Sequence, residues 1–580
     1  MGFLKADSPA IEYESWRTGS RSERLKPLVR HIAERGMGNP DVLYAVYAVK
    51  IVLFILGGFC FAMATKGIDG WGNVASWWSE PIVFQKVVLW ALLFEVLGLG
   101  CGFGPLTGKF KPPMGSVLYW LRTGTLRLPP WPDRIPFTAG DRRTLLEVLL
   151  YAGLLSSTVY ALLSDGTGPA PALDTDVGLL PTWNIALIVV LLALAGIRDK
   201  LIFLASRGEV YGALTVTFLL PGVDMIVAAK LVMIAIWIGA ATSKLNHHFP
   251  YVVATMMGNN PLIRWRWLRK ALYRRFPEDV RPSIIPQLLA HGGTVIEMGV
   301  PLVLFFSHGG VVSAVAATVM VIFHLVILTA IPLGVPLEWN VFMIFGVGSL
   351  FVAHAGVGVG DLEHPWLVAA LMAVIAVAIA LGNFHPPSVS FLPGMRYYAG
   401  NWDISTWCLT ESATEKIHAQ GIGLGKLQHK QLEQLVGPEN AEIAMYRGLA
   451  FRAMYAHGRA VVTLLNRVMP PGRDTDYAVV EGEMVAAYAL GWSFGDGHLH
   501  NENLVRALHA RCHFEPGEVR ILMIDGQPIH HQRQEYRLVD AATGEFERGT
   551  FDIADLIVRQ PWQDDVPLKV TSSATGAGRP

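Results

Sequence analysis

Nine ionisable side chains lie inside stretches of the sequence that are otherwise apolar. They are Lys50, Lys86, Glu95, Glu147, Lys230, Lys244, His291, Glu297 and His324. An ionisable group inside a bilayer is costly, so each is a candidate for proton transfer, ligand binding or a buried ion pair. Lys86 and Glu147 lie near the ends of their stretches, where snorkelling or a first-turn carboxylate accounts for them. Lys50 and Glu95 lie deeper and are candidates for a pair between two helices.

Lys244 is one of these candidates and lies at the end of a predicted membrane helix. It ends an apolar stretch and is followed by Leu245 and Asn246. A lysine accepts a proton only when it is neutral, and burial in a membrane pocket penalises the ammonium form. The alternative is that Lys244 snorkels to the lipid headgroups from the end of its helix.

His291 and Glu297 are separated by about 120° around one helix, at ~100° per residue, so each is expected to meet a neighbouring helix. Gly292 and Gly293 leave a notch that allows another helix or a flat ring to approach closely. For His291, Glu297 and His324 the alternative is a hydrogen-bond network that holds the helices together.

These residues occur in four short motifs in one order along the chain. The motifs are Lys244-Leu245-Asn246, His291-Gly292-Gly293 followed by Glu297, Phe323-His324, and Tyr397-Tyr398 followed by Trp402-Asp403. In this order they resemble the membrane domain of the vitamin K-dependent gamma-glutamyl carboxylases and of the related HTTM-type bacterial proteins. The resemblance covers 145–403 and, more weakly, 536–549. It leaves a helical insertion at 411–517 unmatched.

The resemblance implies an oxygenase cycle in which Lys244 deprotonates a hydroquinone, and oxygen then generates a base strong enough to allow carboxylation of glutamate. It implies a quinone cofactor, such as menaquinone or a vitamin K-like molecule. The implied pocket consists of His291, Gly292, Gly293, Glu297, His324 and Asn246. Trp402 and Asp403 would mark the junction with a soluble domain. The alternative function is a non-catalytic membrane protein, either in lipid or small-molecule transport or as a scaffold whose soluble domain binds a protein partner.

Metal and nucleic acid are not expected. His498 and His500 can share one strand face next to Asp496, but no further ligand is located. His530-His531 and Cys512-His513 are equally incomplete. The four cysteines are far apart and form no disulfide framework or CxxC site. The 47 basic and 47 acidic residues balance, so no overall charge favours a nucleic-acid partner.

The elements that position these residues are membrane helices. Charged residues make up 16% of the chain, below the roughly 25% of soluble domains, and mean hydropathy is +0.38. A span needs about 20 apolar residues. Nine stretches approach that length: 43–65, 82–102, 145–163, 179–197, 225–245, 285–306, 311–331, 339–357 and 365–381. The apolar segment 210–220 is too short and is predicted to be re-entrant or interfacial, with a tenth span left open.

Loop charges predict the orientation. Basic residues in 1–42 and between the second and third spans place both segments in the cytoplasm, in an inner (plasma) membrane. Nine spans then place the C-terminal domain outside. The basic cluster at 264–281 would also lie outside, whereas ten spans would return it to the cytoplasm.

The predicted fold class is an all-α polytopic membrane bundle of about nine transmembrane helices, followed by a small α+β soluble domain. Its four parts are a cytoplasmic N-terminal segment 1–42, a membrane domain 43–384, a soluble domain 385–570 and a disordered tail 571–580. Within the soluble domain, periodicity and turn signals predict helices at 440–469 and 500–512 and strands at 519–524 and 536–539.

Overall fold

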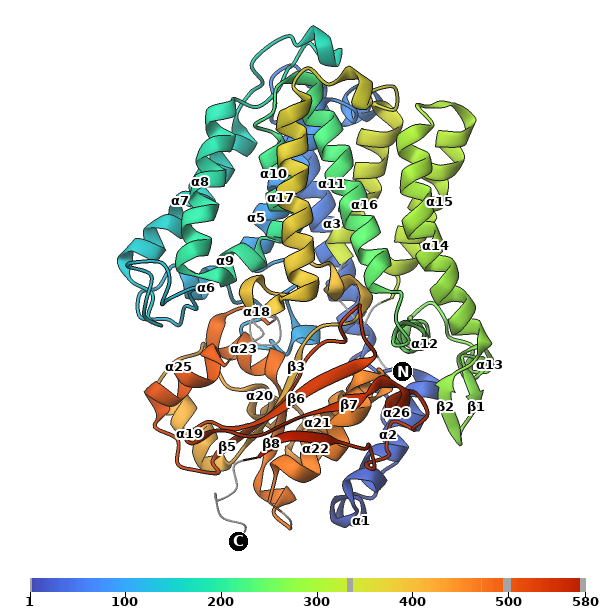
Figure 1. Cartoon of the computed structure of the whole chain (residues 1–580), viewed down its shortest axis with the longest axis vertical. Helices are drawn as coiled ribbons and strands as arrows, with labels where there is room; N and C mark the ends of the chain where they lie inside the picture. The colour runs from blue at the N-terminus through green and yellow to red at the C-terminus, as the bar shows by residue number, and fades with distance from the viewer. Residues whose placement is uncertain (1–2, 331–336, 471, 494–501, 574–580) are drawn as a thin grey trace.

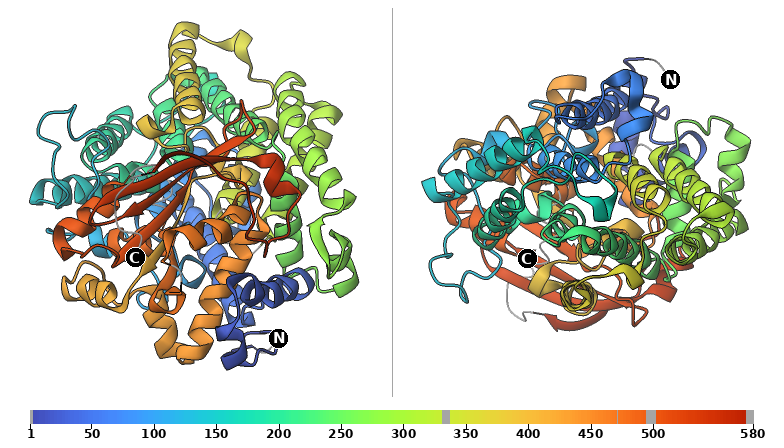
Figure 2. Two further views of the ribbon diagram at one scale, coloured as in Figure 1. Left: turned by 60° about the horizontal axis from the view of Figure 1, so that its bottom comes forward. Right: turned by 90° about the horizontal axis from the view of Figure 1, so that it is seen from above.

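The computed structural model describes residues 3–330, 337–470, 472–493 and 502–573. A bundle of long helices stands on a mixed layer of helices and sheet (Figure 1). The helices of the bundle are α3 Asp41–Met63, α5 Pro81–Val96, α7 Leu145–Leu163, α8 Thr182–Arg198, α11 Gly222–Ser243, α14 Ile284–Phe306, α15 Gly310–Leu328, α16 Leu337–Gly346 and α17 Pro365–Phe384. Figure 2 shows them end-on in the view from above.

Six of these helices, in the described part of the chain, are long and apolar enough to cross a membrane: α3, α7, α11, α14, α15 and α17. The other three predicted spans correspond to shorter helices, since α5 has 16 residues, α8 has 17, and α16 continues only as a π-helix to Ala353. α11 is largely buried, whereas α17 is mostly exposed. α11 is therefore the central helix, and α17 offers its apolar surface to lipid.

The segment 200–217 is a broken helix inside the bundle. It consists of α9 Lys200–Ala205, a π-helix at Gly208–Gly212 and α10 Ala213–Thr217. It starts beside the loop between α5 and α7, which contacts the C-terminal domain through Arg511. It ends where α11 begins, and there Asp224 accepts hydrogen bonds from the backbone N–H groups that precede α17. The segment thus runs the height of the bundle. Irregular backbone is tolerated at that depth because protein surrounds it.

The N-terminal segment packs against the C-terminal domain. α2, Arg21–Arg35, lies on α21, Pro438–Met454 (Figure 1). Tyr13 donates a hydrogen bond to Glu442, and the Arg24 guanidinium lies 4.5 Å from the centre of the Tyr446 ring. Both ends of the chain are therefore on one side of the bundle, which requires an even number of passes. This packing disagrees with the predicted placement of the C-terminal domain on the opposite side from the N-terminus. The predicted nine spans are not shown, since six helices of the described chain are long and apolar enough to cross a membrane.

The C-terminal domain contains a six-stranded antiparallel sheet in the order β4-β3-β5-β6-β7-β8. The strands are β3 Ile404–Leu409, β4 Ala478–Glu481, β5 Val519–Ile524, β6 Arg533–Asp540, β7 Gly544–Asp552 and β8 Lys569–Ser573. The helices packed with it include α19 Glu411–Ala419, α20 Gln428–Val436, α22 Ala460–Val468, α23 Gly482–Leu490 and α25 Asn503–Cys512. A separate hairpin, β1 Tyr273–Arg275 and β2 Asp279–Pro282, precedes α14.

The predicted strand 519–524 is confirmed, and 536–539 lies within β6. The predicted helix 440–469 is two helices, α21 and α22, separated by a 3-10 turn at His457–Arg459. The predicted disordered tail is wrong at its start, because 571–573 belong to β8 and pair with β7. The remaining tail residues lie outside the described residues.

Candidate functional site

A cavity of about 1270 Å³ lies where the bundle meets the C-terminal domain. Its walls come from α12 (Phe249–Asn259), α14, α15, α21 and the N-terminal segment. Most of the lining side chains are aliphatic or aromatic. The volume exceeds the ~300–1,000 Å³ of common small-molecule pockets, so the cavity can accommodate a large apolar molecule.

One side of the cavity opens onto the membrane-facing surface of α14 and α15. Leu288 on α14 lines the cavity and is 64% exposed, and Ile322 on α15 lines it and is 55% exposed. Leu289 and Val326 also line the cavity and are exposed on the outer surface of these helices. Both helices are long and apolar enough to span a membrane, so the opening lies on a surface suited to contact with lipid.

Lys244 and Glu297 form a buried ion pair in the cavity wall. Lys244 is the residue that caps the C-terminal end of α11, and Glu297 lies on the buried face of α14. The Lys244 ammonium also lies 5.4 Å from the centre of the Phe249 ring and 5.9 Å from that of Phe323. Lys244 therefore does not snorkel to lipid headgroups, and Glu297 meets a neighbouring helix as its spacing from His291 predicts.

Gly292 and Gly293 face the cavity. A Cβ added at Gly292 would meet no atom within 4 Å, and one at Gly293 would lie 3.6 Å from the Phe323 ring. The notch is therefore open at Gly292 and lies beside the Phe323 ring of α15 at Gly293, and a ligand contact there stays a prediction. His291 is exposed and does not line the cavity.

His324 is held in a buried interhelical network. Its Nε2 accepts a hydrogen bond from Trp237 Nε1 at 3.0 Å, and its Nδ1 lies 2.9 Å from Asn340 Oδ1. This network joins α11, α15 and α16, as in the structural alternative raised by the sequence. Asn246 Oδ1 accepts a hydrogen bond from Gln527 Nε2 at 3.2 Å, so it connects the end of α11 to the C-terminal domain.

Trp402 and Asp403 lie at the junction of bundle and C-terminal domain. Asp403 Oδ1 accepts a hydrogen bond from the Gly526 N–H at 2.6 Å. Trp402 lines the cavity and donates from Nε1 to Glu483 Oε1 at 2.9 Å. These contacts fix the start of β3 against the cavity.

The cavity has a polar end, formed by Arg452 of α21, Glu481 of β4 and Glu483 of α23. Arg452 Nη2 lies 3.4 Å from Glu481 Oε2 and 3.6 Å from Glu483 Oε1. Burial raises the pKa of Glu483, and the Arg452 charge opposes this effect. Sequence reasoning missed these residues because they lie in the unmatched insertion, outside every apolar stretch.

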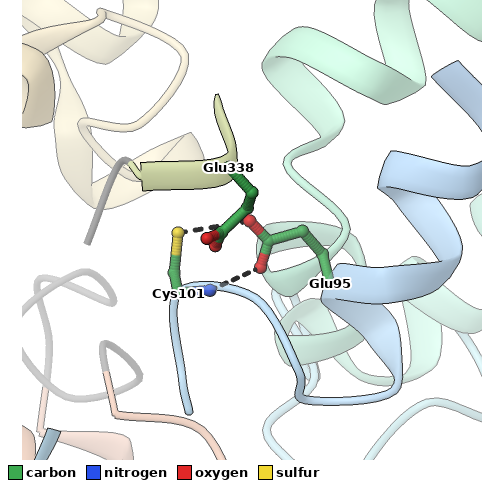
Figure 3. A group of neighbouring side chains, drawn as sticks. All are labelled: Glu95, Cys101 and Glu338. Atoms are coloured by element: carbon green, nitrogen blue, oxygen red, sulfur yellow. Dashed lines mark hydrogen bonds between the residues drawn. The ribbon is translucent and has the colours of Figure 1, made fainter. Parts of the chain in front are cut away.

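A second buried cluster lies inside the bundle. Glu95, Cys101 and Glu338 bring one ligand atom each within 4.8 Å of the others (Figure 3). However, Lys50 Nζ lies 2.9 Å from Glu338 Oε2, and Arg207 donates to Cys101 Sγ at 2.8 Å. Arg207 Nε also lies 3.9 Å from Glu95 Oε1, so two cations compensate the two carboxylates and the charge that a metal ion would supply is present. Lys50 pairs with Glu338, not with Glu95 as the sequence suggested.

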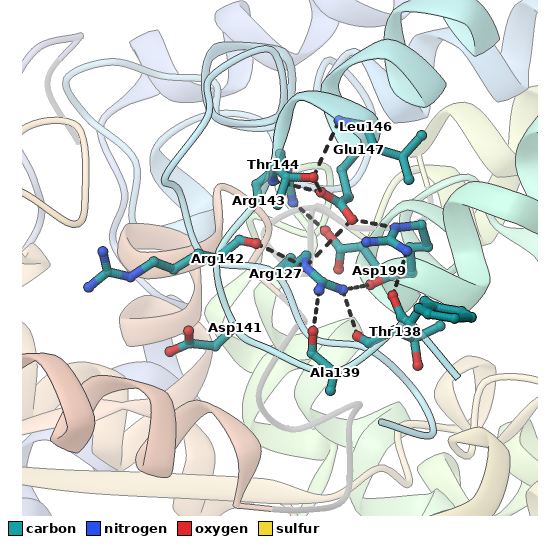
Figure 4. A network of polar contacts seen from close by, with 12 residues as sticks. Arg127, Thr138, Ala139, Asp141, Arg142, Arg143, Thr144, Leu146, Glu147 and Asp199 are labelled. Atoms are coloured by element: carbon teal, nitrogen blue, oxygen red, sulfur yellow. Dashed lines mark hydrogen bonds and ion pairs between the residues drawn. The ribbon is translucent and has the colours of Figure 1, made fainter. Parts of the chain in front are cut away.

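A third network anchors the loop between α5 and α7 (Figure 4). Arg143 pairs with Asp199, Arg198 pairs with Glu147, and Arg127 donates to several backbone carbonyls. Glu147 also forms a capping box with Thr144, which confirms its expected first-turn role. The possible metal ligands Asp496, His498 and His500 lie outside the described residues.

Comparison with known proteins corrects the resemblance to the carboxylases. No curated protein and no solved structure matches the chain. A family model matches residues 1–571, described as a transmembrane protein of unknown function (DUF3556). The match includes the supposed insertion 411–517, which is therefore part of the family's own architecture, and nothing in it indicates an HTTM or vitamin K-dependent carboxylase. The four short motifs were too brief to identify a family. The chain belongs to the DUF3556 family of transmembrane proteins, whose function is unknown.

Proposed function

We propose that this membrane protein binds a large amphipathic lipid in the cavity between its membrane helices and its C-terminal domain. The observation that carries the proposal is the cavity of about 1270 Å³, whose apolar wall continues onto the exposed surface of α14 and α15. A lipid can reach such a site from the bilayer without crossing water, which makes the transfer of its chains nearly free of hydrophobic cost. This function is a form of the non-catalytic alternative raised by the sequence.

The nature of the lipid is open to direct identification. A quinone with an isoprenoid tail is itself a large amphipathic molecule, so the expected quinone stays a prediction with no family argument behind it. A protein partner for the C-terminal domain stays a prediction, and so does location in the plasma membrane.

The test is mass spectrometry of lipids retained by the purified protein, compared with a total extract of the same membranes. Gly292→Leu places a side chain on the cavity surface, where an added Cβ meets nothing within 4 Å. We expect wild type to retain an enriched lipid and Gly292→Leu to lose it. Gly299→Leu is the matched control, since Gly299 is on the same helix, has equal space and does not line the cavity. Retention of the same lipid by Gly292→Leu and Gly299→Leu would refute the proposal.

A further inference from the structure

The polar end of the cavity carries more negative than positive charge. The Arg452 guanidinium faces both Glu481 and Glu483, and the side chains of all three are at least three-quarters buried. Elsewhere in the wall the Lys244–Glu297 pair is balanced, and Arg447 donates to Asp7 O and Ser8 Oγ of the N-terminal segment. When both glutamates are ionised, the polar end therefore has an excess of one carboxylate.

Tyr455 adds an unsatisfied group at this end. It lines the cavity, is 2% exposed, and its hydroxyl has no hydrogen-bond partner among the residues that the structure describes. Burial raises the pKa of Tyr455. Its backbone N–H donates to the Arg452 carbonyl at 3.1 Å, and both side chains line the cavity, so Tyr455 belongs to the polar end. A buried hydroxyl without a partner costs free energy, and a ligand can supply that partner.

We propose that Arg452, Tyr455, Glu481 and Glu483 hold the headgroup of the bound lipid, and that this headgroup is uncharged and carries hydroxyl groups. The inference rests on the proposed lipid-binding function and adds the chemical class of the lipid. The tail lies in the apolar part of the cavity toward α14 and α15, and the headgroup lies in the C-terminal domain.

The donor and acceptor inventory selects hydroxyl groups. The two carboxylates accept hydrogen bonds, the guanidinium donates them, and the tyrosine hydroxyl does either. A hydroxyl group is both donor and acceptor, so it can pair with every member of the set. The Trp402 ring beside Arg452 adds a flat apolar surface of the kind that packs against the C–H face of a polyol.

An anionic headgroup is disfavoured on electrostatic grounds. A phosphate would approach two buried carboxylates with only one guanidinium to compensate them, and like charges repel strongly in a partly desolvated site. A quaternary ammonium would instead compete with Arg452 for the same carboxylates.

The test compares two lipids with the same acyl chains, a pyrene-labelled diacylglycerol and a pyrene-labelled phosphatidic acid, bound to the purified full-length protein in nanodiscs or detergent. Energy transfer from tryptophan reports binding, because Trp402 and Trp339 line the cavity. We expect diacylglycerol to bind more tightly than phosphatidic acid. We expect Tyr455→Phe to weaken diacylglycerol binding about two- to tenfold, the range for one lost hydrogen bond, and to leave phosphatidic acid unchanged.

Tyr455→Phe removes an oxygen that has no partner in the described structure, so folding is retained. Tyr273→Phe is the matched control, since Tyr273 is buried, has an equally unpartnered hydroxyl and does not line the cavity. Equal binding of the two lipids, or tighter binding of phosphatidic acid, overturns the headgroup assignment while lipid binding stands. An unchanged Tyr455→Phe affinity also overturns it. If neither lipid binds to wild type and Gly292→Leu behaves like wild type, the proposed function itself fails.

Discussion

The Lys244–Glu297 pair allows a quantitative prediction about what holds the bundle together. The side chains of Lys244 and Glu297 are 5% and 2% exposed, so water does not replace either partner when the other is removed. Glu297→Leu leaves a buried ammonium without its carboxylate. Removal of one member of a buried pair costs about 3–5 kcal/mol, and we expect Glu297→Leu and Lys244→Met each to lower the free energy of unfolding by that amount.

The double variant Lys244→Met with Glu297→Leu removes both charges and retains the volume of both side chains. Replacing a buried pair by apolar residues is neutral or stabilising by about 1–4 kcal/mol, so the double variant should be at least as stable as wild type. The coupling energy is the cost of the double variant minus the costs of the two single variants, so it is at least about 6 kcal/mol in magnitude.

The assay is unfolding in mixed micelles, followed by tryptophan fluorescence as the denaturing detergent is increased. Glu34→Leu is the matched control, because Lys270 and Glu34 form an ion pair at 2.9 Å whose side chains are 42% and 26% exposed. An exposed pair contributes only about 0–1 kcal/mol. If Glu297→Leu costs no more than Glu34→Leu, or if the double variant is as unstable as the single ones, the pair is not the buried link described here.

Three further predictions follow from other parts of the molecule. A cysteine at exposed Ser572 of β8 should react with a membrane-impermeant maleimide only after permeabilisation, because the C-terminal domain shares a side with the basic N-terminal segment; labelling in intact cells would show that this side is external. Asp199→Asn should lower the free energy of unfolding by about 3–5 kcal/mol and make the 121–143 loop sensitive to protease, because the side chains of Arg143 and Asp199 are 0% exposed. Asp141 and Arg511 form a more exposed pair at 3.6 Å, so the control Asp141→Asn should change this free energy by under about 1 kcal/mol. Equal effects of the two variants would contradict the argument. Burial lowers the pKa of His248 to about 4 from 6.5, so the unfolded chain binds more protons between these values and stability should fall as the pH drops from about 6.5 to about 4. His248→Asn should make the Tm decline less steeply over this pH range, and an unchanged plot of Tm against pH would exclude His248 as a cause.

The membrane helices were largely predictable because apolar length is a local property of the sequence. The limits of α7 agree with the predicted span 145–163, and those of α14 and α17 agree closely with theirs. The end of the spans near Asn383 and the strand at 519–524 were also predictable from local sequence, since a change of composition marks the first and turn residues mark the second.

The short motifs shared with the carboxylases carried less information than their order suggested. Of the residues that they singled out, the structure brings Lys244, Glu297, Gly292, Gly293 and Trp402 to one cavity, and it places His291 on the surface and His324 in an interhelical network. A lysine at a helix end or a pair of glycines has several structural uses, so the residue type does not select the partner.

By itself, the sequence determined a multi-pass membrane bundle followed by a mixed domain, because hydropathy and periodicity act over about 20 neighbouring residues. Only the tertiary structure decided the even number of passes, the ion pairs and the cavity. Tyr13 and Glu442 form a hydrogen bond although they are 429 positions apart in the sequence, and Lys50 and Glu338 form an ion pair although most of the bundle lies between them in the sequence. The physical reason is that a buried charge is stabilised by whatever opposite charge packing brings within a few ångströms, and that neighbour is not specified by any local pattern.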